Sequence, residues 1–435
     1  MKTNAILFGV ATTVVCATGA RAADIPLAAA PEPIDYVRVC DAYGAGYYYI
    51  PGTDTCLSMS GRVRAEYRVF AYDQAFREGN GFATQDRDFN SSQFRARGYL
   101  YMDSRTNTEF GLLRTYMNVY FTADDNDPID VTLDDAYIQF GGFTFGRGQS
   151  FYDFTNYATY ASVFTPQLSD QKTNLAAYTF AFGNGFSTSL SVEDAAARRT
   201  EIGGPYSTTV SYFSGGYDSN GGQVWITEQQ GVGYGGTKYP DLVANMRVDQ
   251  GWGSAQIMGA LHQVWPGYRA EGTASSKVGF AVGGGVVFNL PFGVNTTMNV
   301  TGTYAKGATD YASTDTSGFY SPRGFVVEAY DATYNPSTGD IEMANAWSVS
   351  GGVGTQITPE FGFALQGGYF NLEDEVDSRN GFSNIDVQGD LTYSPGNIDG
   401  FQMGVGLEYR YVDPHEDGAG NGDAYAGYFR AERTF

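Results

Sequence analysis

Residues 57–69 have the sequence LSMSGRVRAEYRV, in which apolar or small residues alternate with polar ones. One face of an extended chain would carry Leu57, Met59, Gly61, Val63, Ala65, Tyr67 and Val69. The opposite face would carry Ser58, Ser60, Arg62, Arg64, Glu66 and Arg68. Successive side chains of a β-strand point to opposite faces, so the pattern predicts a strand with one apolar and one charged face. Its length is sufficient to cross a bilayer when the strand is tilted.

The same alternation returns along the chain and predicts an even set of strands. They cover residues 57–69, 92–104, 108–122, 130–141, 143–148, 172–182, 185–195, 239–250, 252–265, 275–290, 293–306, 345–358, 361–374, 384–395, 400–413 and 423–435. Short glycine- or proline-containing turns alternate with longer loops, the longest at 196–238 and 307–344. This asymmetry is typical of bacterial outer-membrane barrels. We therefore expect an all-β fold, a 16-stranded antiparallel up-and-down transmembrane β-barrel. A soluble β-sandwich also alternates, but it rarely needs strands this long.

Charge and hydropathy restrict the classes of protein that this chain can belong to. The 435 residues carry a formal net charge of −22, which disfavours nucleic acid as a partner. Past the N-terminus no apolar run reaches the roughly 18 residues of a transmembrane helix. The first 22 residues resemble a signal peptide, with Lys2, an apolar run and the cleavage site Ala20-Arg21-Ala22. We predict a signal peptide at 1–22, an N-terminal periplasmic segment at 23–56 and the barrel at 57–435.

Two cysteines, Cys40 and Cys56, follow the predicted signal peptide. An even pair of cysteines in an exported chain predicts a disulfide. A zinc or redox site is the alternative, but the spacing fits neither and no histidine lies near. We expect no metal and no other cofactor.

A second informative stretch is FTFGRGQSFYDFTNYATYASVFTPQLSD, residues 143–170. After a short strand it is rich in Phe and Tyr, and its only acids are Asp153 and Asp170. Exposed loops are usually polar, whereas a long aromatic loop needs a surface to fold against. We expect this third long loop to fold into the mouth of the barrel and to narrow it.

Two motifs resemble those of a known family. Residues 37–57, VRVCDAYGAGYYYIPGTDTCL, are similar to the N-terminal signature of the alphaproteobacterial (Rhizobiales-type) outer-membrane porins. Residues 134–154, DDAYIQFGGFTFGRGQSFYDF, resemble the strands that lead into the third loop of these porins. The resemblance implies a homotrimer in contact with outer-membrane lipid and lipopolysaccharide. It also implies passive diffusion of small hydrophilic solutes and ions through an opening that the third loop narrows.

Charged residues on the inward faces are the candidates for the pore constriction. By strand parity they include Arg62, Arg64, Arg95, Arg97 and Arg114. The resemblance adds Arg147, at a position where general porins carry a wall arginine. Stacked arginines need acids nearby, and Asp153 and Asp170 are the candidates on the loop. Because inward acids prevail on the later strands, we expect a weak overall cation preference that the arginines oppose locally.

Two less specific interpretations of these charges remain open. The arginines could belong to an ordinary polar lumen that Glu66, Asp103 and Asp135 neutralise. Asp153 could instead hydrogen-bond to the backbone of its own loop.

Rival functions depend on other residues. A substrate-specific channel, for example for sugars, would line its path with aromatic rings such as Tyr152, Tyr157 and Tyr160. An outer-membrane hydrolase would need a serine beside His262 or His415, although a lone inward histidine is more often structural. A plugged structural barrel would not have so many polar residues facing inward.

Glycines and aromatic residues allow two further structural predictions. The runs Gly283-Gly284-Gly285 and Gly351-Gly352 have no following lysine-serine pair, so we expect strand bends or close packing and not a phosphate loop. Outward aromatic residues should form belts at the membrane interfaces. Examples are Tyr67, Tyr120, Trp252, Phe288, Phe292 and Trp347.

Overall fold

The structure is a computed structural model. It describes residues 38–72, 91–125, 127–154, 157–204, 208–217, 223–230, 233–267, 274–314, 319–320, 326–327, 329–376, 381–415 and 421–435. The chain divides into two units, Met1–Arg38 and Val39–Phe435, and the second is the fold described below. The predicted signal peptide at 1–22 lies outside the described residues.

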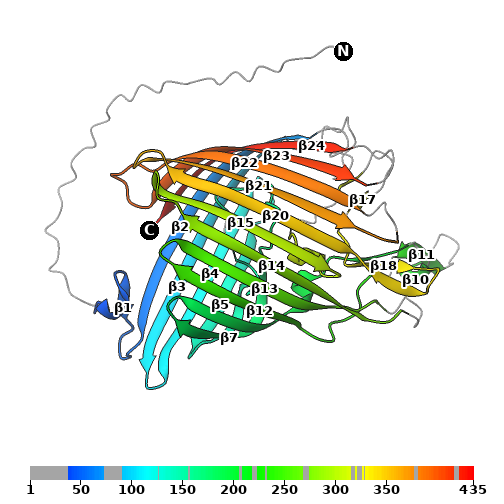
Figure 1. Ribbon diagram of the computed structural model, residues 1–435, viewed down its shortest axis with the longest axis horizontal. Coiled ribbons are helices and arrows are strands. Elements are labelled where there is room, and N and C mark those ends of the chain that lie inside the picture. Colours follow the sequence, from blue (N-terminus) through cyan, green and yellow to red (C-terminus); the bar gives the residue numbers. More distant parts are fainter. Residues whose placement is uncertain are drawn as a thin grey trace, which may run out of the picture. The chain divides into compact units, whose positions relative to one another are not determined.

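A single antiparallel sheet closes on itself to form the barrel (Figure 1). Its strands are β2 (Cys56–Tyr72), β3 (Ser92–Thr108), β4 (Gly111–Asp124), β5 (Asp130–Phe140), β6 (Phe143–Gln149), β7 (Lys172–Gly183), β8 (Phe186–Glu193), β12 (Asp241–Gln250), β13 (Gly253–Val264), β14 (Lys277–Asn289), β15 (Val294–Lys306), β20 (Asn345–Gln356), β21 (Phe361–Glu373), β22 (Phe382–Tyr393), β23 (Phe401–Pro414) and β24 (Gly422–Thr434). The sheet has 17 strands, of which the short β1 (Tyr47–Tyr49) pairs only with β2, so 16 strands form the barrel. Closure occurs where β2 pairs with both β3 and β24. The predicted 16-stranded antiparallel barrel is confirmed.

The N-terminal segment of this unit completes the edge of β2. The last pair between β2 and β24 joins Arg62 to Thr434, and β1 (Tyr47–Tyr49) pairs with β2 beyond that point. A 3-10 helix, η1 (Asp41–Tyr43), precedes β1. The predicted disulfide between Cys40 and Cys56 is present, with their Cα atoms 6.0 Å apart. It therefore fastens this segment to the first residue of the barrel.

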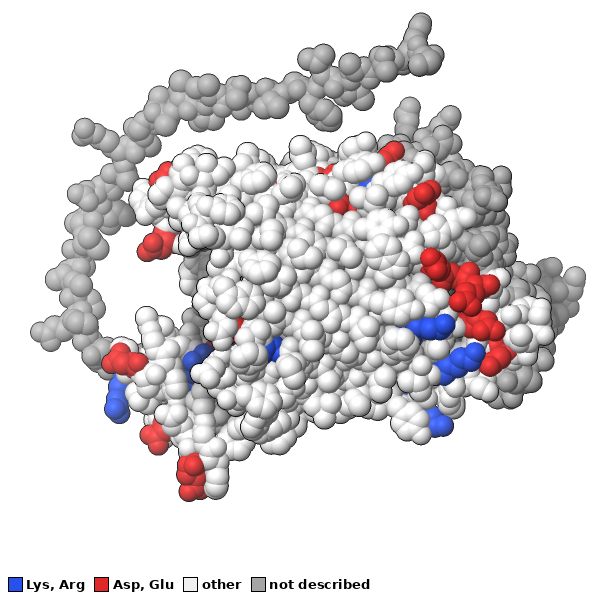
Figure 2. Space-filling model, viewed as in Figure 1, with Lys and Arg blue, Asp and Glu red and all other residues white. Residues whose placement is uncertain are grey.

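The outer face of the barrel is apolar, as the alternation predicts. Exposed side chains on it include Val63, Phe94 and Leu407, with exposed fractions of 57%, 67% and 76%. Figure 2 shows a broad surface almost without charged residues between two ends that carry them. No helix among the described residues is long and apolar enough to span a membrane. An outer face of this kind suits the hydrocarbon core of a membrane.

The long loops gather at one end of the barrel, and the short turns and the C-terminus lie at the other (Figure 1). Two of these loops contain elements of their own. These elements are η2 (Ala195–Arg198), β9 (Ile202–Gly203), β10 (Thr208–Tyr217), β11 (Gln223–Gln230), η3 (Thr309–Tyr311), β16 (Phe319–Tyr320), β17 (Val326–Val327), β18 (Ala332–Asn335) and β19 (Asp340–Met343). Strand β18 pairs with β9 in parallel and so joins the two loops. The alternation does not predict β9, β18 or β19, because strands this short show no clear period of two.

The largest core cluster lies inside the barrel, between the wall and these loops. Small alanines of the wall, such as Ala281, Ala305 and Ala346, pack against Tyr152 and Tyr311. Both tyrosines are fully buried. Alanine on the inner face leaves room for an aromatic ring from a loop, so the loops and the wall share one core.

Candidate functional site

The described residues of the third loop, 150–154 and 157–171, lie along the inner face of the barrel. Its backbone N–H groups at Phe151, Ala158, Tyr160 and Phe164 donate over 2.6–3.0 Å to side chains of four strands. The acceptors are Glu193 of β8, Gln366 of β21, Asp390 of β22 and Glu408 of β23. All four are buried, whereas their chain neighbours Val192, Leu365, Leu391 and Leu407 are exposed on the outer face. The loop is therefore bonded to one side of the inner wall from β8 to β23.

Inward-facing glycines of the wall leave the space that the side chains of this loop occupy. A Cβ atom built on Gly285 would lie 2.7 Å from the ring of Phe154, and one on Gly404 would lie 2.7 Å from the ring of Tyr160. On Gly352 it would lie 2.8 Å from the Cβ of Ala158. Real Cβ contacts are never this short, so any larger residue would displace the loop. Close packing is thus confirmed for Gly285 and Gly352.

The next strands around the barrel, from β24 to β4, carry on their inner face a cluster that we call the arginine wall. One of its members, Arg430, touches the third loop, because its Nη1 donates to the backbone oxygen of Tyr160 at 2.7 Å. Its members are Arg62, Arg64, Arg68, Arg95, Arg97 and Arg430, with the acids Glu66, Asp124 and Glu432. Side chains of β2, β3, β4 and β24 meet here because these strands are neighbours in the sheet. Four of the predicted constriction residues, Arg62, Arg64, Arg95 and Arg97, are therefore brought together.

Hydrogen-bonded ion pairs neutralise only part of the arginine wall. Glu66 accepts from Arg430 Nε at 2.6 Å and from Arg68 Nε at 2.9 Å. Arg95 binds Asp124 through two nitrogens, Nε at 2.6 Å and Nη2 at 2.5 Å. Neutralisation by Glu66, one of the open interpretations, thus applies to part of the cluster. In the described part of this cluster six arginines share three acids, which leaves an excess of positive charge there.

Arg97 carries part of this excess charge. Its Nε donates to Thr122 Oγ1 at 2.8 Å, its Nη1 donates to Tyr99 OH at 3.3 Å, and its Cζ lies 4.5 Å from the centre of the Tyr120 ring. Arg62 stacks on Tyr99 at 3.9 Å. The rings fix the planar guanidinium groups without neutralising them. Tyr120 was predicted to face outward, and this prediction is wrong because its register partner Tyr99 faces the lumen.

Arg114 belongs to a separate cluster nearer the short turns. Its Nη2 lies 2.9 Å from Asp103 Oδ2, and Arg105 shares that carboxylate. Arg114 pairs in register with Arg105, which follows Arg97 by eight residues, or about 26 Å along the strand. The prediction that Arg114 lies with the other constriction arginines is therefore wrong, because Arg114 lies at a different level along the barrel. Asp103 neutralises Arg114, as one of the two open interpretations held.

Arg147 lies on the other face of the sheet. It pairs with Ala136 and Asn174, and its neighbour Phe145 is exposed on the outer face. Its Nε donates to the backbone oxygen of Leu133 at 2.9 Å. The expectation carried over from general porins is thus corrected, because the period of two sets Arg147 on the same face as Phe145.

The two acids of the third loop serve its base. Asp153 is almost fully buried and accepts from the backbone N–H of Gln171 at 2.7 Å and from Arg198 Nη2 at 2.8 Å. Asp170 accepts from Tyr157 OH at 2.7 Å. We predicted that these two acids would face the arginines, and neither contacts the arginine wall. For Asp153 the alternative interpretation, a hydrogen bond to the backbone of its own loop, is confirmed. Asp135, the remaining candidate for neutralising arginines, binds Lys172 instead.

Four charged residues of the site were missed by the sequence analysis, and one of them, Asp124, lies just past the predicted strand 108–122. Arg430 could have been found, because it lies between the apolar Phe429 and Ala431 in the predicted strand 423–435. Glu432 follows from the same parity. Arg198 carries no such signal, because it lies in a loop without alternation.

His262 lies in a buried polar network. Its Nδ1 is 2.9 Å from Asp241, and its Nε2 is 3.2 Å from Tyr234 OH. Tyr234 in turn donates to Asp331 at 2.6 Å. These contacts join the two long loops to the wall and favour a structural role over a hydrolase. His415 donates its backbone N–H to Gly381.

Comparisons with known proteins identify the family. A sequence profile described as "Porin subfamily" matches residues 24–428. The Porin Omp2b of Brucella suis biovar 1 (strain 1330) is 34% identical over 269 residues. That alignment covers 58% of this chain and 64% of the relative, less than two thirds of its length.

Two solved structures show the same fold. The outer membrane channel DcaP of Acinetobacter baumannii has a TM-score of 0.64 at 15% identity, and covers 89% of this chain and 99% of its own. The Salmonella typhi OmpF complex with Daunomycin has a TM-score of 0.52 at 11% identity, with the same coverage. The profile match extends over nearly the whole chain, and the barrel agrees with it: the chain belongs to the porin subfamily.

Proposed function

We propose that the protein is a porin of the bacterial outer membrane, a water-filled channel for passive diffusion of small hydrophilic solutes and ions. One observation carries the proposal, namely inward-facing charges that remain accessible to water within a closed barrel. The side chains of Arg62 and Arg95 are 25% and 19% exposed. In a plugged structural barrel these charges would be buried.

The passage runs between the third loop and the arginine wall. The loop is bonded to the side from β8 to β23, so it narrows the lumen from that side. Arg62, Arg64, Arg95 and Arg97 form the facing surface, and the part of their charge that the acids do not neutralise is the main electrostatic feature of the constriction. Fixed charges at a narrow opening select among ions and polar solutes. The net charge of −22 acts in the opposite sense and favours cations overall.

The proposal also includes the export, the membrane contacts and the assembly of the protein. A signal peptide at 1–22 directs export, a periplasmic segment at 23–56 precedes the barrel at 57–435, and the outer face contacts lipid and lipopolysaccharide. Three copies assemble into a homotrimer. Native mass measurement of the purified protein in mild detergent tests this assembly, and a mass of one chain would contradict it. Neither nucleic acid nor a cofactor takes part.

A substrate-specific channel is the second candidate. Tyr99 and Tyr101 lie parallel, with ring centres 6.0 Å apart and an interplanar angle of 12°, beside Arg62. An aromatic ring suits the flat face of a sugar, and Tyr101 is the candidate here, because Tyr99 is only 9% exposed and is covered by Arg62. The loop tyrosines support this candidate less, because Tyr152 is fully buried and Tyr157 is bonded to Asp170.

Planar-bilayer recording of the purified protein tests both candidates. A general porin gives stepwise ohmic conductance that sugars do not block, and a salt gradient then yields its ion preference. Saturable block by one sugar would favour the specific channel. Absence of any conductance from protein that is folded, as judged by its heat-modifiable gel mobility, would refute both.

A further inference from the structure

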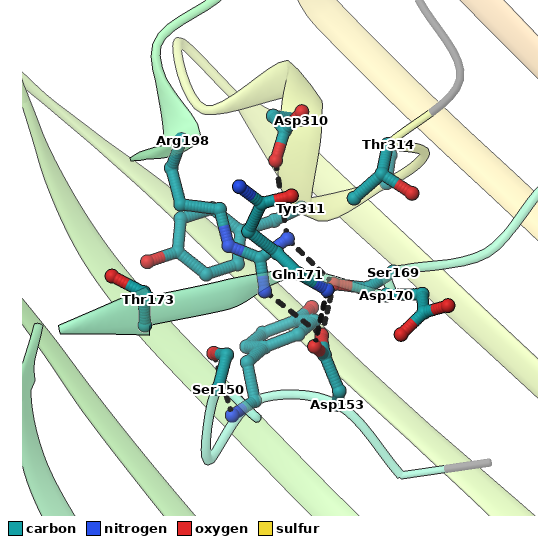
Figure 3. Close-up of polar contacts among 12 residues, drawn as sticks. Ser150, Asp153, Ser169, Asp170, Gln171, Thr173, Arg198, Asp310, Tyr311 and Thr314 are labelled. Atoms are coloured by element: carbon teal, nitrogen blue, oxygen red, sulfur yellow. Dashed lines mark hydrogen bonds and ion pairs between the residues drawn. The ribbon is translucent and has the colours of Figure 1, made fainter. Parts of the chain in front are cut away.

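Arg198 connects the third loop to both long loops from a fully buried position. Its Nη2 donates to Asp153 at 2.8 Å, and its Nη1 donates to Asp310 at 3.1 Å and to Ser169 at 3.0 Å (Figure 3). The guanidinium lies 4.4 Å from the centre of the Tyr311 ring. Its side chain is 0% exposed. One cation thus joins the loop after β8, the third loop and the loop after β15.

Asp153 is the point at which the third loop is closed at its base. Besides Arg198, it accepts from the side chain of Gln149 at 2.5 Å, before the loop begins. It also accepts from Ser169 Oγ and from the backbone N–H of Gln171, where the loop ends. The entry and the exit of the loop therefore meet at one carboxylate, and Arg198 binds that carboxylate from outside the loop.

The other partner of Arg198 is itself fixed to the barrel. Tyr311, next to Asp310, donates to Asp241 of β12 at 2.8 Å and packs edge-on against Tyr152 at 4.8 Å. At the start of η3, the backbone N–H of Thr309 donates to Asp331 at 2.7 Å. The short helix η3 is thus held to the wall and supports the third loop from behind.

We propose that Arg198 sets the position of the base of the third loop, and that the two long loops thereby contribute to the geometry of the constriction. The proposal rests on the proposed porin function. Removing one partner of a buried ion pair leaves the other charge uncompensated. Without Arg198, both Asp153 and Asp310 would be such charges. Burial, the largest effect, raises the pKa of Asp310 to about 6 even with Arg198 present. The base of the loop would then open to admit water.

The test compares Arg198→Gln with Arg199→Gln, a matched control in the same loop. Arg199 donates to the backbone oxygen of Gly235 at 3.2 Å and stacks on Tyr234 at 4.8 Å, and neither of these partners belongs to the third loop. In planar bilayers, R198Q should lose the single conductance level of the wild type and show increased open-channel current noise. R199Q should behave as the wild type.

Limited proteolysis in detergent gives a readout independent of conductance. In R198Q, cleavage sites mapped by mass spectrometry should appear between residues 150 and 171, and R199Q should be as resistant there as the wild type. A folded R198Q with wild-type conductance and resistance would overturn the inference while the porin function stands. If R198Q does not fold, Asp310→Asn decides, because it keeps the Asp153 pair and should show a smaller effect in the same direction. An unchanged D310N would then overturn the inference. A silent wild type with an exposed loop in R198Q would refute only the porin function.

Discussion

Replacing Arg97 with glutamine is the sharpest test of the arginine wall. The hydrogen bonds of Arg97 are formed with neutral partners, Thr122 and Tyr99. Arg95, beside it on the strand, forms a two-nitrogen pair with Asp124. The substitution Arg97→Gln therefore removes a charge that forms no ion pair with an acid of the described residues, and it keeps a polar group of similar width.

The expected size of the effect follows from Coulomb's law. A unit charge about 7 Å from a passing ion in water contributes about 0.6 kcal/mol. Screening at 0.1 M salt reduces this to about 0.3 kcal/mol. Because the arginine attracts anions and repels cations by this amount, its loss changes their relative energies by about 0.6 kcal/mol. The cation-to-anion permeability ratio should therefore rise about threefold.

Reversal potentials across a salt gradient in planar bilayers measure this ratio. The matched control is the double variant Arg95→Gln with Asp124→Asn, which also removes an arginine but leaves the net charge unchanged. Its permeability ratio should stay at the wild-type value. An unchanged ratio in R97Q would mean that Arg97 does not line the passage. Equal shifts in R97Q and the double variant would refute the argument from unpaired charge.

Three further predictions concern the loop, the disulfide and pH. Gly404→Ala should push Tyr160 into the lumen and lower the conductance. The control is Gly389→Ala on the outer face, where the nearest contact is at 3.4 Å and the conductance should not change. Equal conductances of the two variants would contradict the packing of Tyr160 on Gly404. Reducing the disulfide, which closes a separation of 16 residues, should lower the free energy of unfolding by about 3 kcal/mol in the chain-entropy model, and an unchanged urea midpoint of gel mobility would argue against this. Burial raises the pKa of Asp310 to about 6, above its usual value of 3.8, so the folded protein holds a proton that the unfolded chain releases. As pH rises from 3.8 to about 6, the free energy of unfolding of the wild type should fall relative to that of Asp310→Asn. The midpoint of thermal unfolding, followed by gel mobility, measures this difference. A difference that does not change with pH would count against the burial of this carboxyl.

The strands of the barrel could be predicted from the sequence because alternation is a local property. In residues 57–69 every second side chain is apolar or small, and β2 follows this register throughout. The same holds for the strand that contains Arg430. Inward and outward faces therefore followed from parity. The prediction for Arg147 failed because it was taken from a resemblance, against the parity of Phe143 and Phe145.

Heights within the barrel could not be predicted, because they depend on the stagger between strands. Arg97 and Arg114 both face inward, but the register sets Arg114 opposite Arg105, far along the strand from Arg97. Alternation gives the face of a residue and carries no information on its level. Which arginines meet, and which acids neutralise them, is therefore a property of the closed sheet.

For the third loop, the sequence predicts that it packs against a surface, but only the tertiary structure shows which residues form that surface. Its aromatic composition predicted that it needs a surface, since an exposed loop of this kind would leave large apolar rings in water. The surface itself is formed by glycines such as Gly285 and Gly404, more than a hundred residues away in the chain. Arg198 binds Asp153 across 45 residues and Asp310 across 112. Contacts between such distant residues have no local pattern, so only the folded barrel selects them.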